Sequence, residues 1–168
     1  MRLLLAIALA GLPPWIHAWP IGTGPRYRVP ATTAEVRAGN AVGSLLCSMY
    51  PVRIAAHVEV FAKRRVAIVP SGIGRGPECW YPASTTAPTG VVLLTGPQRL
   101  GDLFRVWGQA LGPHRLLSFR GTTAAFVDGR RWRGDPRRIW LTRHAQVVLE
   151  IGGYVPPHPT YLFPKGTP

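Results

Sequence analysis

Hydrophobic and polar residues alternate over residues 52–60, where every second side chain is apolar. Side chains two apart on a strand share a face, so the alternation predicts a strand with one buried face. The residues between them form a predicted polar face: Arg53, Ala55, His57 and Glu59. Apolar residues resume at 66–69. The pattern therefore predicts a hairpin over 52–69, although its turn contains no glycine.

The apolar spacing changes to a helical period after residue 99. Four apolar residues recur at i, i+3, i+4 and i+7: Leu100, Leu103, Phe104 and Trp107. This spacing places them on one face of a helix. An acidic residue in the first turn, Asp102, and a glycine after the last apolar residue, Gly108, are typical of helix ends.

Three further segments have strand-like patterns: residues 91–94, 123–132 and 145–151. The second contains Asp128-Gly129, a strong hairpin turn signal. The third alternates again, with Gln146 and Glu150 predicted to point outward. Together the patterns predict an α+β fold, a mainly antiparallel β-sheet of two hairpins and short strands with one packed amphipathic helix.

The first residues have the layout of a secretory signal peptide, predicted to span residues 1–18. Arg2 gives a positive start, residues 3–12 are apolar, and Ala18 is a small residue before a possible cut. The apolar run is too short for a permanent span, which needs about 20 residues. We therefore expect export to the periplasm or the exterior and no transmembrane segment after cleavage. An uncleaved anchor is the alternative.

The rest of the chain is predicted to divide into three parts. Residues 19–44 are rich in Gly, Pro and Thr and are expected to form an extended or poorly ordered lead-in. Residues 45–155 are expected to form a single α+β domain. Residues 156–168 are a proline-rich tail that cannot join the interior of a sheet.

Two cysteines, Cys47 and Cys79, follow the predicted signal peptide. An even number of cysteines in an oxidising compartment favours a structural disulfide. The alternative, a pair of thiolate metal ligands, is weaker because neither cysteine lies in a C-x-x-C motif or near a histidine.

The chain is strongly basic, with 20 Lys and Arg residues against 7 Asp and Glu. Such a charge attracts anions, although an Arg-, Ala-, Gly- and Pro-rich composition is also what a GC-rich genome produces. The basic residues are scattered along the chain, except for one arginine cluster: Arg130, Arg131, Arg133, Arg137, Arg138 and Arg143.

The arginine cluster alternates with Trp132 and Trp140 and is a candidate anion-binding surface. Two other interpretations remain open. The arginines can protect a hairpin edge, and the tryptophans can belong to the core. A nucleic-acid partner is not expected, because no recognised nucleic-acid-binding module is visible and the chain is predicted to be exported.

Several segments occur in a recognisable order: GIG at 72–74, CWY at 79–81, TGVVLLTGP at 89–97, LGDLFRVWGQAL at 100–111, FVDGRRWRGDPRRIWLTRHAQVVLEIG at 126–152 and YLFPKG at 161–166. With the strand at 53–61 they resemble a family of uncharacterised exported bacterial proteins, over residues 43–166. The F-x-x-W-G helix and the G-D-P-R turn before H-A-Q are the most specific motifs.

Typical members of that family look like metal binders, with an H-x-H-x-H strand, an L-H-T-H-D loop and an I-H-I-E strand. Imidazole clusters suit copper, zinc or nickel. In this sequence the corresponding histidine and glutamate positions are Arg53, Ala55, His57, Ser84, Thr86, Leu93 and Thr95. The resemblance therefore implies a divergent member that has lost most of the presumed metal centre and keeps His57.

His57 has two interpretations. It can be hydrogen-bonded to Glu59 on a polar sheet surface, or it can be one ligand of a copper or zinc site. The candidate second ligand is His144, with His114 and His158 as further candidates.

No catalytic set is visible, since the sequence has no G-x-S-x-G or S-x-x-K motif and GIGRG at 72–76 does not lie between a strand and a helix. The sequence favours a non-enzymatic exported binding or structural module without a cofactor, whose partner is an unknown envelope protein or anionic polymer. The alternatives are an envelope copper- or zinc-binding protein and binding to an anionic surface through the arginine cluster.

Overall fold

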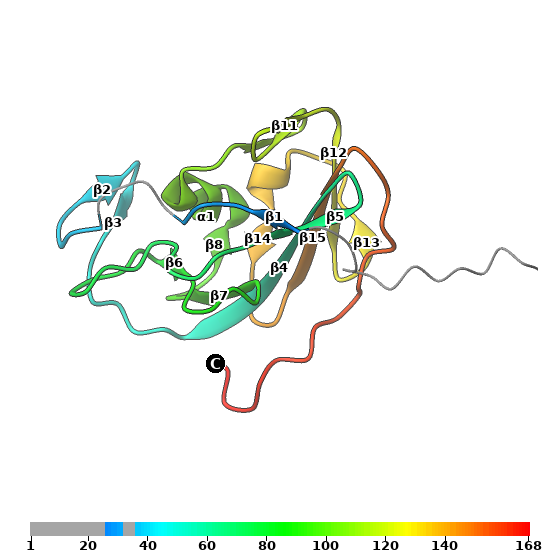
Figure 1. Cartoon of the computed structure of the whole chain (residues 1–168). Helices are drawn as coiled ribbons and strands as arrows, with labels where there is room; N and C mark the ends of the chain where they lie inside the picture. The colour runs from blue at the N-terminus through cyan, green and yellow to red at the C-terminus, as the bar shows by residue number, and fades with distance from the viewer. Residues whose placement is uncertain (1–25, 32–35) are drawn as a thin grey trace, which may run out of the picture.

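A computed structural model describes residues 26–31 and 36–168 of the chain (Figure 1). The predicted signal peptide, residues 1–18, lies outside these ranges. Within them, no helix has the length and apolar character needed to cross a membrane.

The main sheet is built around two long strands, β4 (Ile54–Ala62) and β15 (Gln146–Ile151), which pair in parallel. The sheet order is β1-β5-β4-β15-β12-β13, and β7 pairs with both β4 and β6. The remaining strands of this sheet are β1 (Tyr27–Arg28), β5 (Arg65–Ile68), β6 (Ala83–Ser84), β7 (Val91–Leu94), β12 (Thr123–Val127) and β13 (Arg130–Arg131).

Short elements complete the fold. The small sheets are formed by β2 (Ala41–Val42) with β3 (Leu45–Leu46), by β8 (Gln98–Arg99) with β14 (Trp140–Leu141), and by β9 (Leu111–Gly112), β10 (Arg115–Leu116) and β11 (Phe119–Arg120). The helices are α1 (Leu100–Trp107) and the 3-10 turn η1 (Pro136–Arg138). The predicted α+β class, mainly antiparallel with one packed helix, is confirmed, and the parallel β4–β15 pair is an addition to it.

Both predicted hairpins form, and both use turns with positive φ at the two central residues. In the β4–β5 hairpin these residues are Lys63 and Arg64, with φ of 50° and 63°. In the β12–β13 hairpin they are Asp128 and Gly129, with φ of 49° and 74°. This is the geometry of type I′ turns, whose twist matches that of the strands, so the first hairpin forms without a glycine.

The helix α1 buries its apolar face in the main core, as its spacing predicts. Phe104 and Trp107 are fully buried, and Gly108 ends the helix in the left-handed conformation with φ of 70°. The Trp107 indole donates to the carbonyl of Pro30 at 2.7 Å. This bond ties part of the predicted lead-in, residues 19–44, to the domain, and Tyr27 in the same segment pairs with Ala67 of β5.

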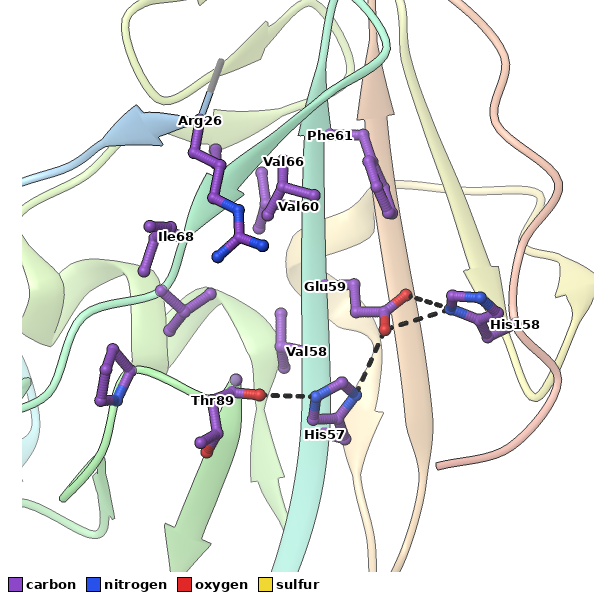
Figure 2. A pocket seen from close by; sticks show the side chains of 14 residues that line it. Arg26, His57, Val58, Glu59, Val60, Phe61, Val66, Ile68, Thr89 and His158 are labelled. Atoms are coloured by element: carbon purple, nitrogen blue, oxygen red, sulfur yellow. Dashed lines mark hydrogen bonds and ion pairs between the residues drawn. The ribbon is translucent and has the colours of Figure 1, made fainter. Parts of the chain in front are cut away.

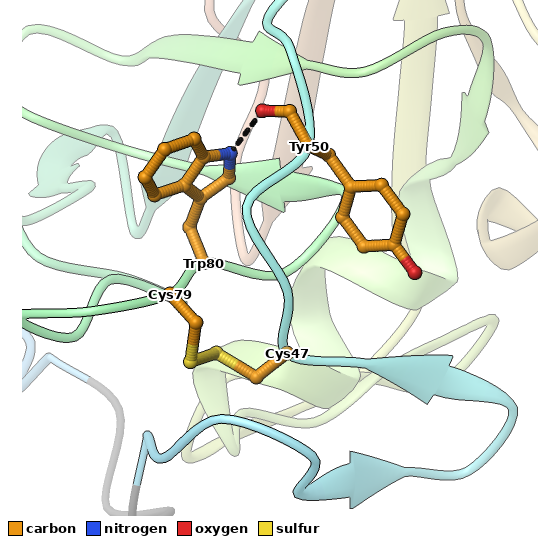
Figure 3. Close-up of a disulfide and its surroundings, with 4 residues drawn as sticks. All are labelled: Cys47, Tyr50, Cys79 and Trp80. Atoms are coloured by element: carbon orange, nitrogen blue, oxygen red, sulfur yellow. Dashed lines mark hydrogen bonds between the residues drawn. A yellow bond between two sulfur atoms is a disulfide. The ribbon is translucent and has the colours of Figure 1, made fainter.

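Cys47 and Cys79 form the predicted disulfide. It joins the segment after β3 to the long loop before β6. The two segments continue side by side, and the backbones of Ser48 and Trp80 exchange two hydrogen bonds (Figure 3). The Trp80 indole donates to the carbonyl of Tyr50 at 2.7 Å. The disulfide therefore stabilises a junction that contains no long strand.

The prediction that β4 and β15 each expose a polar face is wrong. His57 is 3% exposed, Gln146 1% and Glu150 2%. The reason is the C-terminal segment, which covers the face of the sheet opposite α1 (Figure 1). The proline-rich residues 156–168 stay out of the sheet interior, but they form a layer over it. The carbonyl of Pro168 even accepts a bond from the Ala55 amide at 2.9 Å.

Candidate functional site

A pocket opens where the sheet loses continuity along one edge of β4. On that edge β7 pairs with β4 only as far as His57, and β5 pairs only from Phe61 onward. Between these points β5 and β7 separate and leave a pocket of about 390 Å³ (Figure 2). Its volume lies within the range of small-molecule sites.

The walls of the pocket are mostly apolar, with a few polar groups around them. Aliphatic and aromatic side chains from β4, β5 and the residue after β5 line it: Val58, Val60, Phe61, Val66, Ile68 and Val69. The polar lining comes from Arg26, His57, Glu59, Thr89 and His158. Figure 2 shows the Arg26 guanidinium directed into the pocket from the side opposite His57. Apolar walls with a few convergent polar groups are typical of ligand sites.

Gly90 shapes the floor of the pocket through a close backbone approach. Its φ is +80°, and an added Cβ would lie 2.5 Å from the carbonyl oxygen of Val58 and 2.9 Å from Nε2 of His57. The Gly90 carbonyl accepts from the Val58 amide at 2.9 Å. This position requires glycine, because any side chain would collide with the β4 backbone.

His57 is held by two hydrogen bonds rather than by the predicted bond to Glu59. Its Nδ1 lies 2.7 Å from Oε1 of Gln146, and its Nε2 lies 2.8 Å from the carbonyl oxygen of Thr89. The nearest Glu59 oxygen is 3.9 Å from Nδ1. The prediction is wrong because β15 places Gln146 directly beside His57 and because the C-terminal segment removes the ring from solvent.

Both ring nitrogens of His57 therefore face oxygen atoms. A neutral imidazole donates from one nitrogen only, so either the ring carries two protons or the Gln146 side chain turns its amide nitrogen toward Nδ1. The second arrangement gives a partner to the Gln146 amide nitrogen, which is buried and unsatisfied. In both arrangements His57 has no free ring nitrogen.

Glu59 pairs instead with a histidine of the C-terminal segment. The His158 Nδ1 lies 2.9 Å from one Glu59 oxygen and 3.2 Å from the other. Glu59 thus lies between His57 and His158 at the edge of the pocket (Figure 2). Among the candidate partners of His57, His158 is the histidine that lies near it, and Glu59 lies between the two rings.

His144, the predicted second ligand, does not meet His57. It is exposed at the turn before β15, with φ of 58°, and its ring stacks on Phe163 at a centroid distance of 4.5 Å. Two aromatic rings, Phe163 and Tyr161, lie in series between the two histidines. His114 is exposed in the turn between β9 and β10. In the described ranges no group of three or more His, Cys, Asp or Glu residues is arranged to hold a metal.

Three of the positions that the sequence resemblance implies as histidine sites lie in one row across the sheet. Ala55 of β4 pairs with Leu93 of β7, and Leu93 pairs with Ser84 of β6. Side chains at directly opposite positions share a face, so histidines there would converge. Here the row holds alanine, leucine and serine, which have no metal-binding side-chain nitrogen.

The arginine cluster is divided between two places in the fold. Arg130 and Arg131 are exposed on the edge strand β13, whereas Arg137 and Arg138 belong to η1 beside α1. The side chains of Arg133 and Arg143 are also exposed. The cluster therefore does not form one compact site.

Side chains in and around the arginine cluster make contacts with their neighbours. Two bonds of 2.8 and 3.0 Å join Arg137 Nε to Asp135, and this pairing holds the pKa of the Asp135 carboxyl below its usual range. Arg99 stacks on Trp140 at 3.6 Å. Trp132 and Trp140 are partly exposed, so the alternative that placed them in the core is wrong.

Arg26, Gln146, Tyr161 and the Glu59–His158 pair were not predicted as site residues from the sequence. His57 and Gln146 are 89 residues apart, and Glu59 and His158 are 99 apart. No local pattern links positions so distant in the chain. The sequence feature that could have indicated them is the presence of polar residues on otherwise apolar strands.

Comparisons of the chain with protein-family models, curated protein sequences and solved structures find no match.

Proposed function

We propose that this protein is an exported, non-enzymatic binding module that holds a small amphipathic anion in the pocket beside β4. The observation that carries the proposal is the Arg26 guanidinium directed into a pocket with largely aliphatic walls. Among residues 26–31 and 36–168, no carboxylate forms an ion pair with Arg26. A guanidinium without an acidic partner suits a carboxylate, sulfonate or phosphate group, and the walls suit an apolar body.

The state of His57 supports binding over catalysis. A general base needs a ring nitrogen within reach of a substrate proton. Both nitrogens of His57 are occupied by Gln146 and Thr89, so this residue positions the pocket floor. The predicted signal peptide and the Cys47–Cys79 disulfide support export, because disulfides persist in oxidising compartments.

Binding is tested with 8-anilinonaphthalene-1-sulfonate, a fluorescent probe with one sulfonate on an apolar ring system. We expect the mature, oxidised protein to bind one molecule, and Arg26→Ala to weaken binding at least about tenfold, as loss of one charge-assisted contact does. Arg28→Ala is the matched control, because Arg28 is also an exposed arginine, lies two residues further along at the end of β1, and is not among the residues that line the pocket. Equal affinity of Arg26→Ala and wild type would refute the proposed site.

A second candidate is a reduced copper or zinc site at His57, Glu59 and His158, which would require these side chains to rearrange, because in the described ranges no three such residues are arranged to hold a metal. It is favoured by the contact of both histidines with Glu59. Binding through His57 Nδ1 would require loss of its bond to Gln146. Native mass spectrometry with Zn²⁺ and then Cu²⁺ tests this candidate. A 1:1 adduct that disappears in both His57→Ala and His158→Ala but persists in His114→Ala would support it, and an adduct unchanged by these substitutions would reject it.

A further inference from the structure

The C-terminal segment of residues 154–163, here called the strap, is attached to the sheet at a few separate points. Val155 packs in a cluster with Phe61, Phe126 and Val148, and His158 pairs with Glu59. Farther along, Tyr161 stacks on His57. No residue of the strap belongs to a strand. Its attachment therefore depends on individual side chains rather than on a hydrogen-bonded ladder.

Two large side chains next to the attachment points are directed to solvent. Leu162, next to Tyr161, is 92% exposed, and Tyr154 is 60% exposed. The strap thus contributes little apolar burial apart from Val155 and the rings of Tyr161 and Phe163. Segments with few buried contacts open at a lower free energy than the domain unfolds.

The strap also forms part of the pocket. His158 is one of its lining residues, and Tyr161 covers the outer face of the His57 ring, whose other contacts fix the pocket floor. When the strap is docked, His158 pairs with the Glu59 carboxylate at the edge of the pocket. When it is undocked, Glu59 faces the pocket without its partner and repels an anion.

We propose that the strap is a movable wall of the pocket, whose docking through His158 and Tyr161 favours ligand binding and is favoured by it in return. The inference rests on the proposed function, because it names how that same site is regulated. Docking and binding then share one coupling free energy. Ligand binding increases the equilibrium constant for docking, and docking increases the affinity for the ligand by the same factor. If a substitution leaves the strap docked in about one molecule in five, the apparent affinity falls about fivefold.

The first test requires no ligand and measures motion of the strap by ¹⁵N relaxation in the mature, oxidised protein. In wild type we expect order parameters at Thr160 and Leu162 close to those of the strands. In Tyr161→Ala they should fall below about 0.6, the flexible range. Tyr161→Phe keeps the ring, and Leu162→Ala removes a neighbouring side chain that contacts solvent, so both should match wild type. Unchanged order parameters in Tyr161→Ala would overturn the strap proposal.

The second test compares affinities for 8-anilinonaphthalene-1-sulfonate. Tyr161→Ala and His158→Ala should bind the probe about fivefold more weakly, and Leu162→Ala should bind like wild type. Wild-type affinity in a Tyr161→Ala variant with a mobile strap would overturn the coupling. If wild type itself does not bind the probe, the proposed function fails, and the relaxation comparison alone decides whether the strap docks as described.

Discussion

The rings of His57 and Tyr161 lie nearly parallel, with centroids 3.6 Å apart and planes inclined by 9°. His57 belongs to the central strand β4, and Tyr161 belongs to the proline-rich C-terminal segment. Tyr161 also makes an edge contact with Phe163, which stacks on His144. This series of rings explains how a segment without strands remains on the sheet and why the histidine face of β4 is buried.

The stacking predicts a spectroscopic signature at His57. Ring protons that lie over an aromatic face are shifted upfield, so the His57 ring protons should move downfield in Tyr161→Ala and stay in place in Tyr161→Phe. The measurement is a ¹H–¹³C spectrum of the histidine rings. Loss of the stacked pair should also lower the free energy of unfolding by about 1 kcal/mol. Identical His57 shifts in wild type and Tyr161→Ala would contradict the contact.

Glu150 predicts a pH dependence of stability. Burial raises the pKa of this carboxyl to about 7, although the Val155 amide and the nearby Arg131 charge oppose the shift. Because the folded state holds the proton more tightly than the unfolded state, the contribution is most favourable below about pH 4.5 and is lost as pH rises to 7. Over this pH range the free energy of unfolding should fall by up to about 3 kcal/mol.

Urea unfolding at pH 5 and pH 8 measures this effect. Glu150→Gln keeps an oxygen acceptor for the Val155 amide and removes the ionisation, so it should be more stable than wild type at pH 8 and should show a smaller difference between the two pH values. Equal pH dependence in the two proteins would show that Glu150 does not titrate between pH 5 and pH 8.

Gly90→Ala should destabilise the fold and close the pocket. The new Cβ would collide with the Val58 carbonyl oxygen, and the φ of +80° is itself unfavourable for alanine, so we expect a loss of at least about 2 kcal/mol. Gly96→Ala is the control, because its Cβ would meet no atom within 4 Å and its φ is not in the left-handed region. Thermal and urea denaturation of both variants provide the measurement. Equal stability of the two would be inconsistent with the close approach at Gly90.

Removal of the disulfide should cost about 4 kcal/mol, the chain-entropy value for two cysteines 32 positions apart. The double variant Cys47→Ala, Cys79→Ala should therefore unfold at a much lower urea concentration than the oxidised wild type. Reductant should shift the wild-type transition toward that of the variant and leave the variant itself unchanged. A wild type that is insensitive to reductant under unfolding conditions would argue against this contribution.

Local features of the sequence predicted the elements of the fold. The i, i+3, i+4, i+7 spacing from Leu100 to Trp107 gave the helix, and Asp128-Gly129 gave the second hairpin. The cysteine count gave the disulfide. Each of these depends on interactions that are close in sequence or on the simple pairing of two residues, which a pattern of residue types is able to express.

The burial of polar strand positions was not predictable in the same way. Alternation in β4 and β15 indicates that one face is apolar, but it does not say what covers the other face. Gln146 and Glu150 are buried because the C-terminal segment returns over the sheet, and this return depends on His158 meeting Glu59 and Tyr161 meeting His57.

The sequence by itself determined the α+β class, both hairpins, the helix and the disulfide, because short-range spacing and residue type control them. Only the tertiary structure decided the parallel pairing of β4 with β15, the pocket between β5 and β7, and the partners of His57. These features join residues that are distant in the chain, and their geometry is set by packing of the whole domain, which no single segment encodes.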